Sequence, residues 1–285
     1  MLLCALALVS PALAAKPVDF ERAAPDAAHA RVSAPRAFNL VGLHWRGTAT
    51  PDVELRVLRA GGWGRWQHLG VHGRGGSDPV WVGRARTVQY RLDRRVPGLR
   101  LHFVAVGKRH TRVRAAQTTT TGFPYVSRED WGASSCVPRA APSYGTVKAV
   151  QVHHTVSLND YTPEEAPQIV LAICRYHRNS NGWNDIGYNA LVDKYGTLYE
   201  GRAGGLDQAV IGAHAQGFNS QTGGSRTSAT TPRSAPARSR CPPRPRTSAG
   251  SSECTVSRCP GPSRSRAQEG RRAATQQAAG SRSSA

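Results

Sequence analysis

The stretch from Val147 to Val156, Val-Lys-Ala-Val-Gln-Val-His-His-Thr-Val, decides the fold of this chain. It predicts a β-strand that ends in two histidines, His153 and His154. A neutral imidazole is a good zinc ligand, and a strand fixes the direction in which the ring points. A histidine pair alone is a weak signal, because most such pairs are structural or solvated.

A helix is predicted directly after this strand. Thr162 is a suitable N-cap, Pro163 occupies the first helical position, and Glu165 at the third position can reach back to the cap. After this start, apolar and other core-type residues recur at helical spacing, namely Ala166, Ile169, Ile173 and His177. Gly182 is the expected end of the helix.

Two further strands are predicted beyond the helix, over residues 188–193 and 197–201, joined by Lys194-Tyr195-Gly196. A strand, a helix and a hairpin in this order predict an α/β layer, a mixed sheet with packed helices.

Upstream, the sequence predicts a separate all-β domain over residues 37–118, of a small sandwich-like type. Three runs alternate with period two between glycine-rich breaks, one of them Val53, Leu55 and Val57 with polar residues between. Residues 16–36 are rich in Ala, Pro and charge and are interpreted as a linker. Four tryptophans either line a sugar platform or fill the core and its rim, and we favour the second; they are Trp45, Trp63, Trp66 and Trp81.

The N-terminus is typical of an export signal over residues 1–15. Leu2–Val9 is apolar and Ala12-Leu13-Ala14 has the small-x-small form of a cleavage site, although a basic start is missing. The alternative is a buried N-terminal strand. No other run is long enough for a transmembrane helix. With the export signal, we expect a secreted or cell-wall-associated protein, and we expect it to be a monomer. In such a protein Cys136 and Cys174 are expected to form a disulfide, the alternative being two buried thiols.

Residues 223–285 differ sharply from the rest. Val256 is their one large aliphatic residue, and twelve arginines against two glutamates give them +10 of the chain's net +20. Such a segment buries too little apolar surface to offset its ordering entropy, so we expect a disordered tail.

Three more motifs accompany the histidine pair. They are Gly-Trp-Asn-Asp-Ile-Gly-Tyr-Asn at 182–189, Tyr-Glu-Gly-Arg-Ala-Gly-Gly at 199–205 and Gly-Ala-His-Ala-Gln-Gly-Phe-Asn at 212–219. With Arg128, Asp130, Trp131 and Gly132, they closely resemble the N-acetylmuramoyl-L-alanine amidase / peptidoglycan-recognition family over about residues 126–222. We therefore expect such a domain at 123–222. Residues 38–107 resemble, more weakly, the N-terminal domain of actinobacterial relatives.

The resemblance implies a zinc-dependent peptidoglycan hydrolase that cleaves the N-acetylmuramoyl-L-alanine amide bond. In that family two histidines and one cysteine hold Zn²⁺, which activates a water molecule. His153 inherits a metal-ligand role, and Tyr188 the catalytic hydroxyl that stabilises an oxyanion. His154, Arg202 and His214 are assigned to substrate binding. A core tyrosine and a buried salt bridge are the alternatives for Tyr188 and Arg202.

The resemblance stops after about residue 222. No histidine follows His214, and Cys259-Pro260-Gly261 matches the family's last ligand motif only by chance, so one zinc ligand is assignable. A frameshift accounts for the break, because reading the codons of residues 225–231 one base earlier permits Ile-Ala-His-Val-Gly-Asn-Tyr. The alternative is a genuine basic tail.

Three functions compete on this basis. The first is an amidase by descent, possessing little or no activity as written. The second is a non-catalytic peptidoglycan-binding module. The third, a nucleic-acid or anionic-polymer binder acting through the arginine-rich tail, ranks last because the tail lacks aromatic residues that stack on bases, and we expect no specific nucleic-acid partner.

Overall fold

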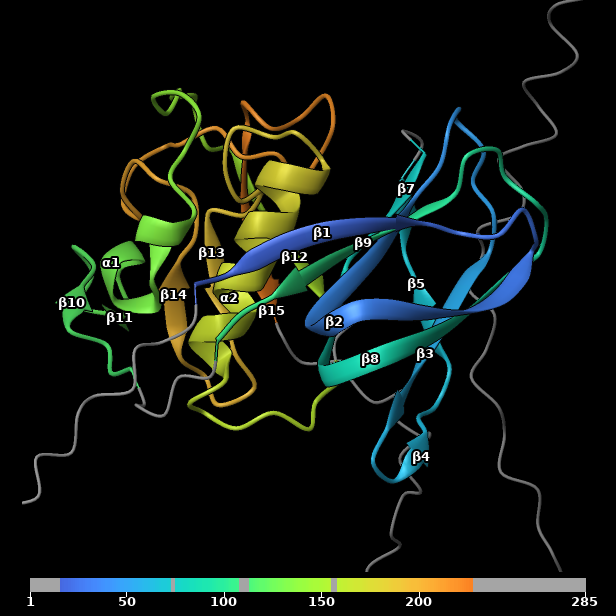
Figure 1. The fold of residues 1–285 in the computed structure, drawn as a ribbon. Coiled ribbons are helices and arrows are strands. Elements are labelled where there is room, and N and C mark those ends of the chain that lie inside the picture. The colour runs from blue at the N-terminus through green and yellow to red at the C-terminus, as the bar shows by residue number, and fades with distance from the viewer. Residues whose placement is uncertain (1–15, 73–74, 108–112, 155–157, 228–285) are drawn as a thin grey trace, which may run out of the picture. The chain divides into compact units, whose positions relative to one another are not determined.

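The computed structural model describes residues 16–72, 75–107, 113–154 and 158–227 (Figure 1). The predicted signal peptide and residues 228–285 lie outside the described residues. No helix in the described part is long and apolar enough to cross a membrane.

The N-terminal half is a nine-stranded antiparallel sheet in the order β1-β9-β2-β8-β3-β4, with three short strands beside this path. Inward-facing residues of the long strands alternate with outward-facing ones, as the period of two predicts, and form its core. The strands are β1 (Val18–Ala23), β2 (His29–His44), β3 (Val53–Arg59), β4 (Gly62–Trp63), β5 (Gln67–Leu69), β6 (Val71–His72), β7 (Gly76–Ser77), β8 (Val80–Leu92) and β9 (Arg100–Ala105).

The prediction of a linker over residues 16–36 is wrong. Strand β1 pairs with β9 along its whole length, from Val18 opposite Ala105 to Ala23 opposite Arg100, and β2 begins at His29. Strand β1 is an edge strand, so only one of its sides needs a backbone partner. Its polar residues Glu21 and Arg22 are exposed, and Asp19 is half-buried in an ion pair with Arg175. The composition of this segment therefore does not identify β1 as a strand.

The four tryptophans divide into two pairs. Trp45 and Trp81 are buried, while Trp63 and Trp66 are half-buried at the rim of the sheet. Arg56 lies over both rim rings, 5.0 Å from the centroid of Trp63 and 4.5 Å from that of Trp66. The core-and-rim interpretation matches this arrangement, since guanidinium groups occupy the ring faces that a sugar would use.

The C-terminal half contains a four-stranded mixed sheet in the order β12-β15-β13-β14, in which β15 runs parallel to both its neighbours. The hairpin β13–β14 is antiparallel, as expected. The elements of this half are β10 (Gln117–Thr118), β11 (Pro124–Tyr125), α1 (Arg128–Trp131), η1 (Ala133–Ser135), β12 (Ala149–His154), α2 (Ala166–Arg175), η2 (Tyr176–Ser180), β13 (Ala190–Val192), β14 (Leu198–Glu200) and β15 (Thr222–Thr227).

The predicted start of the tail at Gly223 needs correction. Strand β15 covers Thr222–Thr227, so the first five residues assigned to a disordered tail form a central strand of the sheet. Both neighbours bond to its backbone, and backbone pairing requires no large side chains.

Helix α2 begins later than the sequence predicts. Residues 163–165 form a turn, and the helix proper starts at Ala166. The expected capping contact is nevertheless present, because the backbone N–H of Thr162 donates to the Glu165 carboxylate at 2.9 Å. A π-turn, η2, extends the helix, and Gly182 ends it with φ of 72°.

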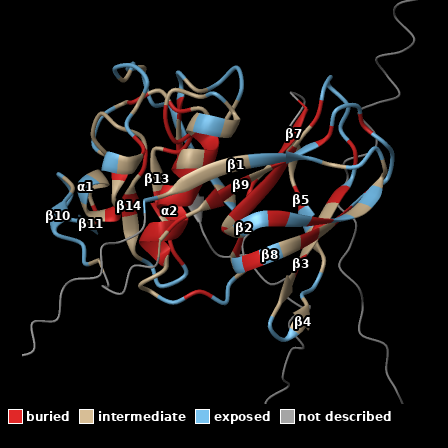
Figure 2. Cartoon of the chain, viewed as in Figure 1, coloured by how far each residue is buried: buried red, intermediate tan, exposed pale blue. Residues whose placement is uncertain are grey.

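Every residue of α2 from Ala166 to Cys174 is buried (Figure 2). A helix that is apolar all round must be covered on all sides. One core cluster joins α2 to residues of the C-terminal sheet, such as Leu191 and Tyr199, and also to Leu40 and Val104 of the N-terminal sheet. The two halves therefore share this helix.

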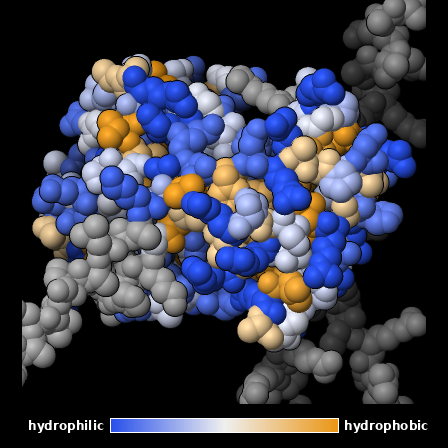
Figure 3. Space-filling model, in the orientation of Figure 1, coloured by the Kyte–Doolittle hydropathy of each residue, from blue (hydrophilic) through white to orange (hydrophobic). Residues whose placement is uncertain are grey.

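Strand β12 is less well covered. Val150 and Val152 keep 64% and 70% of their surface exposed. On the face of the molecule drawn in Figure 3, hydrophilic side chains predominate. The C-terminal sheet is therefore only partly covered at β12.

Polar contacts accompany the shared helix. The buried hydroxyl of Tyr176 lies 2.8 Å from Nε2 of His44 in β2 and 3.4 Å from the carbonyl oxygen of Ser77. Burial raises the pKa of Tyr176 well above its usual value, so the hydroxyl keeps its proton. A Cβ atom at Gly42 would lie 2.1 Å from this hydroxyl, which explains the glycine there.

We predict that Tyr176→Phe lowers the free energy of unfolding by about 1–3 kcal/mol, because it leaves buried hydrogen-bonding partners unsatisfied. Urea denaturation measures the change. Tyr144→Phe is the matched control, since Tyr144 is 55% exposed, and it should change stability by less than about 0.5 kcal/mol. Equal effects of the two substitutions would contradict the shared interface.

Candidate functional site

The end of β12 brings a second histidine beside His153. Nε2 of His153 lies 3.3 Å from Nδ1 of His214, and the two rings meet edge to face with centroids 5.4 Å apart. On its other side, Nε2 of His214 lies 3.3 Å from the carbonyl oxygen of Thr222. A carbonyl only accepts, so Nε2 of His214 carries a proton and its Nδ1 lone pair faces His153.

The electrostatic surroundings keep His214 neutral. Burial lowers its pKa most, the carbonyl of Thr222 opposes this, and the positive charge of Arg202 lowers it further. Near neutral pH Nδ1 of His214 is therefore a hydrogen-bond acceptor or a ligand atom.

The ring of His214 is fixed by its loop. The backbone N–H groups of His214 and Ala215 both donate to Oδ1 of Asn219, at 2.9 and 2.8 Å. Cβ atoms at Gly212 and Gly224 would lie 2.6 and 2.3 Å from Cδ2 of the ring. Only glycine leaves the imidazole room at both positions.

Tyr188 also lies near His153, with ring centroids 6.0 Å apart, and is 6% exposed. His177 supports it from η2: its ring lies 5.4 Å from that of Tyr188 and 4.6 Å from that of Trp183, and its Nδ1 accepts the Gly187 N–H at 3.1 Å. Helical spacing identified His177 as a core position, and its contact with the 182–189 loop was not predicted.

Asn189 is another residue whose role the sequence did not reveal. Its N–H donates to the carbonyl of Gly224 at 2.8 Å, and its side-chain Oδ1 accepts the Gly224 N–H at 2.9 Å. Its Nδ2 donates to the carbonyl of Val210 at 2.7 Å. This side chain therefore ties β15 to the loop that leads to His214. The motif at 182–189 marked the residue but gave no reason for it.

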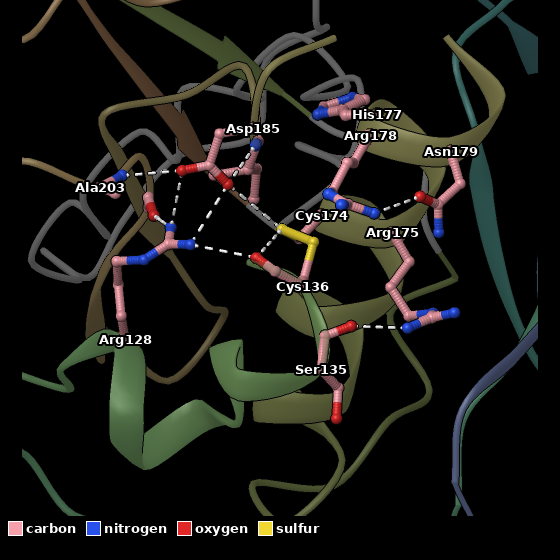
Figure 4. Close-up of a disulfide and its surroundings, with 12 residues drawn as sticks. Arg128, Ser135, Cys136, Cys174, Arg175, His177, Arg178, Asn179, Asp185 and Ala203 are labelled. Carbon is pink, nitrogen blue, oxygen red and sulfur yellow. Dashed lines mark hydrogen bonds and ion pairs between the residues drawn. A yellow bond between two sulfur atoms is a disulfide. The ribbon is translucent and has the colours of Figure 1, made fainter. Parts of the chain in front are cut away.

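A disulfide and a buried ion pair connect α1, α2 and the loop at residues 182–189 (Figure 4). Cys136 and Cys174 are joined. Asp185, which is fully buried, lies 3.1 Å from Arg128 and accepts the N–H groups of Ala203 and Ile186 at 2.9 and 2.8 Å. Sulfur atoms bonded to each other are not thiolate ligands, and Asp185 is already engaged, so we exclude this cluster as a metal site.

Two other predicted site residues lie differently. His154 is exposed, and as the next residue along β12 it points to the opposite face from His153. Arg202 donates to the carbonyl of Ile186 at 3.3 Å, and burial lowers its pKa, an effect that Asp185 opposes and Arg128 strengthens. The structure thus brings together His153, His214 and Tyr188.

Three ligands from the protein are typical of a catalytic zinc site. Among the described residues, no third His, Cys, Asp or Glu completes a cluster with His153 and His214. This part of the chain therefore offers two imidazoles, one more than the sequence assigned.

Comparisons with known proteins match each half separately. A family model, "Rv3811 N-terminal galactose-binding domain-like", matches residues 6–124. Peptidoglycan-recognition protein SC2 of Drosophila simulans is 36% identical over 101 residues, which cover 35% of this chain and 52% of that protein. Peptidoglycan recognition protein 1 of Bos indicus is 36% identical over 91 residues, covering 31% and 44%. The chain spans about half the length of such curated relatives.

Two solved structures also match part of this chain. Peptidoglycan recognition protein LE in complex with tracheal cytotoxin is 30% identical, covering 36% of this chain and 58% of that one, with a TM-score of 0.32. The N-acetylmuramoyl-L-alanine amidase LysC from Clostridium intestinale is 28% identical, covering 32% and 54%, with a TM-score of 0.26.

We predict that Arg128→Met destabilises the protein by about 3–5 kcal/mol, because it leaves the Asp185 carboxylate buried without its cation. Urea denaturation gives the value. Arg94→Met removes an exposed ion pair, with 64% of the Arg94 side chain in solvent, and should cost no more than about 1 kcal/mol. Similar losses for both variants would show that the Asp185 pair does not organise the domain.

Proposed function

We propose that this chain, homologous over about a third of its length to peptidoglycan-recognition proteins and an N-acetylmuramoyl-L-alanine amidase, binds peptidoglycan. The observation that carries the proposal is the convergence of His153, Tyr188 and His214 at one end of β12, within the homologous segment.

The chemistry of these groups suits such a ligand. Peptidoglycan fragments present amides, hydroxyls and carboxylates, and a phenol with two imidazoles supplies hydrogen-bonding groups for them. The relative solved with tracheal cytotoxin, described as monomeric diaminopimelic acid-type peptidoglycan, supports this ligand class. The chain's net charge of +20 favours association with anionic wall polymers.

A cell-wall location is part of the proposal. Disulfides persist in oxidising compartments outside the cytosol, so the Cys136–Cys174 bond supports export. The predicted signal peptide is consistent with export.

Hydrolysis of the muramoyl-alanine amide is the second candidate, favoured by the position of Tyr188 beside His153. Zinc, when bound in such enzymes, supplies an activated water and polarises the scissile carbonyl. Tyr188 would donate a hydrogen bond to the developing oxyanion. The described residues do not fit a three-ligand site, so we place binding first.

We predict that Tyr188→Phe and His214→Gln each weaken binding of tracheal cytotoxin by about two- to twelvefold, the loss of one hydrogen bond of about 0.5–1.5 kcal/mol. Isothermal titration at moderate salt, which screens the arginine-rich segment, measures the affinity. His29→Gln alters an exposed histidine of the N-terminal sheet and should leave binding unchanged.

Unchanged binding in both site variants would contradict the proposed site. Release of free L-alanyl amino termini from purified peptidoglycan, measured in the same preparations, separates the two candidates. Binding without release supports a recognition module, and release that Tyr188→Phe abolishes supports the amidase.

A further inference from the structure

The outward face of the N-terminal sheet carries arginines on three adjacent strands. Arg31 of β2 and Arg56 of β3 both lie opposite Gln89 of β8, the strand between them. Residues paired in this way project from the same face of a sheet. Val88, the residue before Gln89, is buried on the other face, so the row faces outward. Arg91, two residues beyond Gln89, projects from the same outward face.

Two half-buried tryptophans of the rim connect these arginines. Each guanidinium carbon lies 4.4–5.4 Å from the centroid of a neighbouring indole ring, within the range of about 6 Å for a cation–π contact. Guanidinium and indole groups thus alternate. We call the whole array the Arg–Trp ladder; its members in order are Arg31, Trp63, Arg56, Trp66 and Arg91.

The positive charge of the Arg–Trp ladder is only partly balanced. Arg91 is paired with the carboxylate of Glu54. Among the residues that the structure describes, no Asp or Glu forms an ion pair with Arg31 or Arg56, and Nε of Arg56 donates at 2.9 Å to the neutral side chain of Gln89. Unbalanced charges of one sign gathered on one surface raise the local potential and attract anions.

The ladder suits oxyanions better than sugars or nucleobases. A guanidinium group presents a planar fork of N–H donors that matches phosphate and carboxylate geometry. Contact with the indole rings restrains that fork beforehand, so less side-chain freedom is lost when an anion binds. The guanidinium groups also lie over the rings on which a sugar or a base would have to stack. Cations repeated along one face therefore fit a chain of repeated anions.

We propose that the Arg–Trp ladder is a binding surface for a linear polymer that carries repeated oxyanions, either phosphodiester or carboxylate groups. Arg31 and Arg56 supply the unbalanced charge, and the two indole rings hold the guanidinium groups in place. The surface uses no residue of the candidate site at His153. It therefore goes beyond the proposed function, and either can fail without the other.

A titration of the full chain with linear inorganic polyphosphate, followed by ¹H–¹⁵N NMR, tests the surface. The indole N–H signals of Trp63 and Trp66 should shift, while those of the buried Trp45 and Trp81 should stay in place. Because these signals are local, binding of the polymer to the arginine-rich residues 223–285 does not produce them. Polygalacturonate is titrated in parallel, and the polymer that binds more tightly identifies the oxyanion.

The affinities of variants follow from the same titration. Arg31→Met and Arg56→Met should each weaken binding of polyphosphate by about two- to fivefold, the effect of losing one exposed ion pair. Arg56→Lys keeps the charge but loses the planar fork, so it should restore only part of that loss. Arg114→Met is the matched control, because it removes one exposed positive charge outside the N-terminal sheet and should leave the affinity unchanged.

Several results would overturn the proposal. The first is the absence of shifts at Trp63 and Trp66 with either polymer, a result that needs no variant and stands even if a variant folds poorly. The second is the same shifts with neutral dextran, which would show a sugar platform. The third is tighter binding of oligothymidylate than of polyphosphate with equal charge, which would show stacking of bases. The last is an equal loss of affinity in Arg114→Met and Arg31→Met.

Discussion

Asn189 and Gly224 exchange two hydrogen bonds, and the placement of His214 beside His153 depends on that exchange. The Asn189 N–H donates to the Gly224 carbonyl, while its side-chain oxygen accepts the Gly224 N–H. These bonds hold β15 beside β13, and β12 pairs with the other side of β15. The Thr222 carbonyl then reaches the ring of His214, which in turn faces His153.

The composition of β15 explains why it depends on such bonds. Its sequence, Thr-Gly-Gly-Ser-Arg-Thr, contains no large apolar residue, and glycine loses more backbone entropy on folding than any other residue. Backbone bonds to two parallel neighbours and the asparagine amide must offset that cost. Gly224 is nevertheless required, because a Cβ at this position would overlap the His214 ring.

Much of the α/β layer could be predicted from local signals. The strand before His153, the Thr162–Glu165 cap and the stop at Gly182 are each encoded within a few residues. The pairing of His153 with His214 could not be predicted, because it joins residues 61 positions apart through the register of a strand whose composition indicates disorder. The edge strand β1 was missed for a similar reason, since its partner β9 lies about 80 residues later in the chain.

The account depends most on β15 being a stable central strand. Hydrogen exchange of the Asn189 and Gly224 amides, resolved by NMR in the full chain, tests this directly. Both amides should exchange far more slowly than those of an unstructured peptide and as slowly as the amides of the neighbouring hairpin, because each is hydrogen-bonded within the sheet. Exchange of both at the unstructured rate would contradict the account, because β15 could then not position the Thr222 carbonyl at His214.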